Sequence, residues 1–101
     1  MASRQCTMTI ADDLYVEWKF DDKRPPSRRN WVGEFPIGYN GMVYQFTVHQ
    51  RGKKGEERLY LDWGSQRVRF KNLRHASIWM LSMQGKIGPL GKLALLAQLD
   101  D

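Results

Sequence analysis

The chain has 101 residues and a mass of 11.8 kDa, which is the size of one domain with one hydrophobic core and excludes a two-domain enzyme. Hydrophobic residues make up 42% of the chain and charged residues 27%, a composition typical of a folded protein. The formal net charge is +5, but residues 23–92 alone hold fourteen basic and four acidic residues. We expect this central cationic segment to attract anionic partners.

Cysteine content and hydropathy indicate the compartment. Cys6 has no second cysteine to pair with, which favours a reducing environment. The first thirteen residues lack the apolar stretch of a signal peptide, and no stretch approaches the roughly 18 apolar residues of a membrane span. We therefore expect a cytoplasmic protein, or a nuclear one if its source is eukaryotic, with no membrane association.

Residues 1–13 are interpreted as a polar, flexible N-terminal lead-in, and residues 14–101 as a single globular domain. The segment 14–20 alternates apolar and polar residues and predicts a half-buried strand. Two prolines in the segment 21–30 predict a charged, exposed loop. The segment 30–37 predicts a short edge strand, because Pro36 and nearby glycines limit its length.

The strongest pattern is a pair of alternating runs at residues 42–50 and 58–63, separated by a basic loop that contains glycine. It predicts a β-hairpin. Gly64 and Ser65 predict the next turn, and residues 66–70 predict a further strand.

After Phe70 the period changes from two to that of a helix. Residues 73–84 follow helical spacing, with Asn72 suited to cap the start and Gly85 to end it, although a strand through 77–83 is the alternative. Residues 90–99 predict a second helix, which is apolar on nearly all sides and therefore expected to be buried in the domain or in a partner. The predicted fold is α+β, with an antiparallel sheet of four to five strands over about residues 14–70 followed by C-terminal helical segments.

Alternation also predicts which side chains share a face. If the more apolar face of each strand packs on the helices, the opposite face carries basic and aromatic groups. Twelve of the sixteen basic residues lie in three windows, 23–29, 51–58 and 67–74. The predicted nucleic-acid-binding residues are Arg58, Tyr60, Arg67, Arg69 and Lys71 on the sheet, and Arg51, Lys53, Lys54, Arg28 and Arg29 in loops.

This combination suits a nucleic acid, DNA or RNA. Lys and Arg neutralise phosphates and release counterions, and an exposed ring such as Tyr60 offers a platform on which a base can stack. The predicted function is sequence-tolerant binding to a single strand. The simpler interpretation is that Arg67 and Arg69 keep an exposed sheet face soluble while the aromatic residues form the core.

Two other functions remain open at this point. Trp, Tyr, Met and Arg are enriched at protein interfaces, so the chain is alternatively a phage- or plasmid-type inhibitor or adaptor that binds an acidic or nucleoprotein partner, and its last helix offers a homodimer contact. The chain lacks sequence motifs for a bound metal, a nucleotide or a nucleophilic serine, so no cofactor, metal or catalytic residue is predicted. The remaining enzymatic hypothesis is a metal-independent ribonuclease that uses His49 with Lys53, Arg67 and Arg69.

Overall fold

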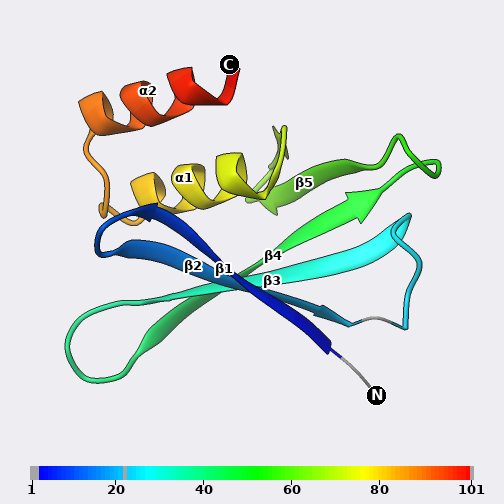
Figure 1. Cartoon of the computed structure of the whole chain (residues 1–101), viewed down its shortest axis with the longest axis horizontal. Helices are drawn as coiled ribbons and strands as arrows, with labels where there is room; N and C mark the ends of the chain where they lie inside the picture. The colour runs from blue at the N-terminus through cyan, green and yellow to red at the C-terminus, as the bar shows by residue number, and fades with distance from the viewer. Residues whose placement is uncertain (1–2, 22, 101) are drawn as a thin grey trace.

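The computed structural model describes residues 3–21 and 23–100 and shows a six-stranded antiparallel sheet followed by two helices (Figure 1). Each strand pairs with the one before it in the chain, so the sheet order is that of the sequence. The elements are β1 (Ser3–Ala11), β2 (Leu14–Asp21), β3 (Arg28–Pro36), β4 (Val43–Arg51), β5 (Arg58–Trp63), β6 (Gln66–Phe70), α1 (Leu73–Met83), α2 (Pro89–Ala97) and a 3₁₀ turn (Gln98–Asp100).

The α+β class is confirmed, but the sheet has six strands and not four to five, because the expected lead-in forms β1. Its residues 3–11 pair with β2, while residues 1 and 2 lie outside the described part. Met8 and Ile10 alternate with threonines, and Ile10 is buried against the core. A short alternation of apolar and polar residues thus forms a strand here, because the edge of β2 offers backbone hydrogen bonds.

The expected short edge strand is in fact β3, a nine-residue central strand between β2 and β4. Pro36 is its last residue, where the missing N–H costs least. Gly33 lies in its middle because the rings of Trp18 and Phe46 cover the backbone there. A Cβ at this position would lie 2.8 Å from Phe46 Cζ and 2.9 Å from Trp18 Cζ3.

The hairpin formed by β4 and β5 confirms the alternation and its two faces. Phe46 and Val48 of β4 are buried, as are Leu61 of β5 and Phe70 of β6. The intervening residues point to the opposite side of the sheet, as the period of two requires.

Residues 73–83 form a helix, so the strand alternative is wrong. Asn72 caps α1 by accepting a hydrogen bond from the backbone N–H of His75 at 2.8 Å. Gly85, with φ of +76°, follows the helix in a left-handed conformation that favours glycine. Trp18 Nε1 donates to Ser77 Oγ at 2.9 Å, which joins α1 to the centre of the sheet.

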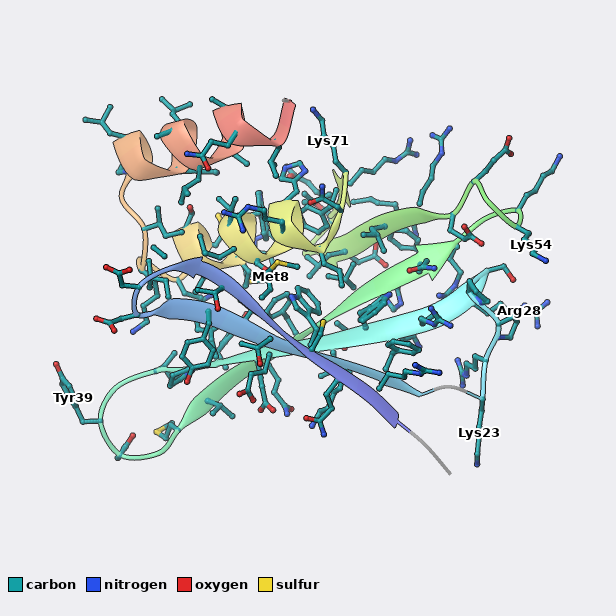
Figure 2. The ribbon with its side chains drawn as sticks, in the orientation of Figure 1. Met8, Lys23, Arg28, Tyr39, Lys54 and Lys71 are labelled. Carbon is teal, nitrogen blue, oxygen red and sulfur yellow. The ribbon has the colours of Figure 1, made fainter. Side chains whose placement is uncertain are left out.

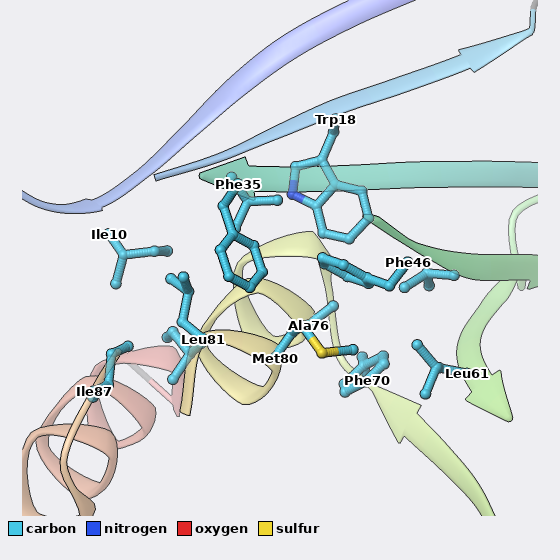
Figure 3. Packing of buried hydrophobic residues seen from close by; sticks show 13 residues of the cluster. Ile10, Trp18, Phe35, Phe46, Leu61, Phe70, Ala76, Met80, Leu81 and Ile87 are labelled. Atoms are coloured by element: carbon cyan, nitrogen blue, oxygen red, sulfur yellow. The ribbon is translucent and has the colours of Figure 1, made fainter. Parts of the chain in front are cut away.

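The core lies between the sheet and α1. Figure 3 shows Trp18 and Phe46 on the sheet side and Ala76 and Met80 on α1 facing one another. The buried cluster comprises Ile10, Val16, Trp18, Phe35, Phe46, Val48, Leu61, Phe70, Ala76, Ile78, Met80, Leu81 and Ile87.

The second helix, α2, is less buried than its composition predicts. Leu95 and Leu96 pack against the core, whereas Leu90 and Leu93 are 82% and 65% exposed. Only one side of α2 therefore packs within the domain, whereas the whole helix was expected to be buried. No helix in the described part of the chain is long and apolar enough to cross a membrane.

Candidate nucleic-acid interface

The sheet face opposite the helices carries five arginines on β3 to β6, and we call it the cationic face. Arg28, Arg51 and Arg58 are register partners across three strands and form one row. The next row runs Asn30, His49, Tyr60 and Arg69 across four strands. Asp62 of β5 and Arg67 of β6 are register partners in the row that follows. The members of the cationic face are Arg28, Asn30, Arg51, Arg58, His49, Tyr60, Asp62, Arg67 and Arg69.

Arg51 is held rigidly at the edge of this face. Its Nη1 donates to the carbonyl oxygens of Arg29 and Gln50, both at 2.9 Å, and its Nη2 donates to Asn30 Oδ1 at 2.9 Å. Arg51 was expected in a loop, but it is the last residue of β4. The guanidinium is thus a fixed positive charge whose position depends on two strands.

Tyr60 lies in the middle of the cationic face and is half-buried. The guanidinium carbon of Arg67 lies 4.0 Å from the centroid of its ring, and Arg67 Nε also donates to Asp62 Oδ1 at 3.1 Å. One side of the ring is therefore already covered.

Arg58 and Arg69 are exposed beside Tyr60. Within the described part of the chain, neither guanidinium has a hydrogen bond or ion pair to another residue. Both line a hollow of about 230 Å³ that Arg51, Tyr60 and Arg67 also line. Among the described residues, the N–H donors of Arg58 and Arg69 in this hollow are therefore not occupied by another protein group, whereas Arg51 and Arg67 are hydrogen-bonded.

His49 is the one titratable imidazole on this face, with its ring centroid 5.2 Å from that of Tyr60. Partial burial of the ring, and next the charge of Arg51, lower the pKa of His49 below its ordinary value of 6.5. Arg67 acts in the same direction, whereas Asp62 raises the pKa. The imidazole is consequently neutral at pH 7.

The remaining predicted cations lie at the border of the cationic face. Lys53 and Lys54 are exposed in the loop between β4 and β5. Figure 2 shows Lys54 and Arg28 at the same end of the sheet. Lys71 follows β6 and lines a second hollow together with Arg58 and Arg69, so the structure brings it close to the face.

Arg29, which was predicted together with Arg28, lies on the other side of the sheet from the cationic face. It pairs with Gln50, which places it on the helix side of the sheet, and its guanidinium carbon lies 3.9 Å from the centroid of Phe20. Arg28 and Arg29 were both expected in a loop, but they begin β3, where neighbouring residues must point to opposite faces. The cation–π contact with Phe20 gives Arg29 a packing role.

Sequence reasoning missed Asn30, whose Oδ1 lies 2.9 Å from both Arg51 Nη2 and His49 Nδ1. It also missed that the other end of the same face is acidic. Glu17 and Glu34 are cross-strand partners there, and Lys19 lies 3.7 Å from Glu34. The face is therefore positively charged at the end that holds Arg28, Arg51 and Arg58 and carries acidic groups at the end that holds Glu17 and Glu34.

Comparison with known proteins gives no match to this chain among family models, curated proteins or solved structures. In the part of the chain that the structure describes, no group of three or more His, Cys, Asp or Glu side chains is arranged to hold a metal ion.

Proposed function

We propose that the protein binds nucleic acid in a sequence-tolerant manner, with single strands as the favoured form, and that it acts as a binding protein rather than an enzyme. The observation that carries the proposal is the row of Arg28, Arg51 and Arg58 across three strands, next to Tyr60 and Arg69. Guanidinium groups so spaced neutralise successive phosphates, and this contribution does not depend on base sequence.

The shape of the face favours a single strand. In the described part of the chain, no helix lies on this side of the sheet to enter a major groove, and a sheet with an aromatic residue offers unpaired bases a stacking surface. The stacked pair of Arg67 and Tyr60 would contact bases while Arg51, Arg58 and Arg69 contact phosphates.

The experiment is a fluorescence anisotropy titration of a labelled single-stranded oligonucleotide with the protein at low and moderate salt. We expect the logarithm of the binding constant to fall linearly with the logarithm of the salt concentration. The slope should be several units, about 0.7 for each phosphate contacted. The oligonucleotide recovered afterwards should be intact on a gel. Absence of binding at low salt would overturn the proposal, and cleavage would favour the ribonuclease alternative.

A second candidate, an adaptor or inhibitor that binds a protein, is favoured by exposed apolar side chains away from the cationic face. Leu90 and Leu93 lie on α2, and Tyr39, Met42 and Val43 lie between β3 and β4 or at the start of β4. Such residues are frequent in protein interfaces. This candidate predicts association that changes little with salt, whether with a partner or with a second copy.

A further inference from the structure

A chain of hydrogen bonds fixes the tautomer of His49 at the centre of the cationic face. Asn30 Oδ1 accepts from Arg51 Nη2, and because a guanidinium only donates, the contacting amide atom must be the oxygen. The same oxygen lies 2.9 Å from His49 Nδ1. An amide oxygen cannot donate, so Nδ1 carries the hydrogen, and the lone pair of the neutral imidazole lies on Nε2.

This arrangement is anchored to the backbone rather than to mobile groups. Arg51 is itself held by the carbonyl oxygens of Arg29 and Gln50. Within the described residues, Asn30 is the hydrogen-bonding partner of the His49 ring, and Nε2 is not among the buried polar atoms that lack a partner. Nε2 is therefore an oriented acceptor that is open to a ligand.

His49 Nε2 is a hydrogen-bond acceptor on a face whose arginine side chains are hydrogen-bond donors. Arg51, Arg58 and Arg69 present N–H groups, which match phosphate oxygens in RNA and DNA alike. A lone pair on Nε2 would repel a phosphate oxygen, so its complement must be a ligand donor. The 2′-hydroxyl of ribose is such a donor, and it is the group by which proteins distinguish RNA from DNA.

The position of His49 in the sheet agrees with a contact between its imidazole and a ribose. His49 is two residues from Arg51 on the same strand and therefore on the same face, and it is the cross-strand partner of Tyr60. A nucleotide whose phosphate meets Arg51 or Arg58 and whose base meets the stack of Tyr60 and Arg67 has its sugar between them. His49 adjoins both groups, because Arg51 is two residues away on β4 and Tyr60 lies directly across on β5.

We propose that His49 Nε2 accepts a hydrogen bond from a ribose 2′-hydroxyl and makes the cationic face selective for RNA over DNA. The inference rests on the proposed function, because it assigns the ligand class of the same site. A single net hydrogen bond corresponds to a preference of about threefold to tenfold.

The test compares three single strands of one sequence at about pH 7.5, where His49 is neutral. They are an RNA, a DNA with uracil in place of thymine, and a 2′-fluoro strand, which keeps a polar group at the sugar but cannot donate. Anisotropy titrations should show RNA binding about threefold to tenfold tighter than both other strands. Equal binding of all three would overturn the inference and leave the proposed function standing, whereas no binding of any strand would overturn both. A 2′-fluoro strand that binds as tightly as RNA would also overturn it.

Protonation gives an independent readout on the unmodified protein. As the pH falls below the pKa of His49, which lies below 6.5, Nε2 gains a hydrogen and can no longer accept one from the 2′-hydroxyl, so the ratio of RNA affinity to DNA affinity should fall with pH. The other charged or titratable groups on this face around His49 are Arg28, Arg51, Arg58, Tyr60, Asp62, Arg67 and Arg69, and their effects are shared by the matched strands. An RNA-to-DNA ratio that stays constant while the imidazole signals of His49 show that the ring becomes protonated would overturn the inference.

The variant His49→Phe keeps a ring beside Tyr60 and leaves Asn30 bonded to Arg51. The ratio of its RNA affinity to its DNA affinity should fall to about one, whatever the change in overall affinity. An unchanged RNA preference in this variant would overturn the inference.

Discussion

The free guanidinium groups of Arg58 and Arg69 allow the phosphate-binding role of the cationic face to be tested in isolation. Both side chains are exposed, and neither has a hydrogen bond or ion pair within the described part of the chain. The double variant Arg58→Gln with Arg69→Gln thus removes two charges without breaking a structural contact. Exposed substitutions of this kind change the free energy of unfolding by no more than about 0.5 kcal/mol each.

The expected loss of affinity follows from counterion release. Each phosphate contact to a single strand contributes about 0.7 to the slope of log affinity against log salt, so two lost contacts lower the slope by about 1.4. With the affinities of the two proteins taken as equal at about 1 M salt, the lower slope corresponds to about 25-fold weaker binding at about 0.1 M salt. Anisotropy titrations at several salt concentrations measure both quantities.

A matched control removes the same charge from the helical side. Lys86 follows α1 and Lys92 lies in α2, so Lys86→Gln with Lys92→Gln changes the net charge equally on the other side of the sheet. We expect a much smaller loss of affinity in this control. An unchanged salt slope in the folded arginine variant, or an equal loss in the lysine control, would refute the assignment of phosphate contacts to this face.

Three further predictions test the fold and the environment of His49. Gly33→Ala places a methyl group within 3.0 Å of Phe46 and Trp18 and should destabilise the protein by about 1 to 3 kcal/mol in urea denaturation; an unchanged midpoint would contradict the close ring packing. Phe46→Ala should cost about 3 to 5 kcal/mol in the same assay, and a loss near zero would mean that the sheet faces are reversed. The pKa of His49 is lower in the folded state than in the unfolded state, so the unfolded state binds more protons just below pH 6.5. The neutral ring therefore contributes its full stability above this pH, and this contribution is lost as the pH falls through the folded pKa. Relative to His49→Phe, the unmodified protein should lose stability between about pH 7.5 and pH 5, whereas parallel stability curves would contradict the lowered pKa.

The alternation of residues 42–70 was sufficient to predict both faces of the sheet in this region. Phe46 and Leu61 had to share one face and Arg58 and Tyr60 the other, because side chains in a strand alternate whatever the partner strand is. The spacing of residues 73–84 and the cap at Asn72 favoured a helix but left a strand through 77–83 open, and the structure shows the helix at 73–83.

The errors lie where strand pairing decides the structure. The strand β1 contains few strongly apolar residues, and its order depends on the edge of β2. Arg29 was placed with Arg28 by charge alone, whereas β3 extends back to both residues and separates them onto opposite faces. Asn30 acquires its role only through bonds to Arg51 and His49, 21 and 19 residues away. Contacts at such separations leave no periodic pattern in the sequence.

The most direct test of the account is to locate the bound oligonucleotide on the protein. In a two-dimensional amide spectrum of ¹⁵N-labelled protein, addition of a single-stranded RNA should shift or broaden signals of Asn30, Arg51 and Tyr60. Signals of Leu93 and its neighbours in α2 should stay in place, because they lie on the other side of the sheet. Perturbations confined to α2, with the cationic face unaffected, would contradict the central claim that this face binds nucleic acid.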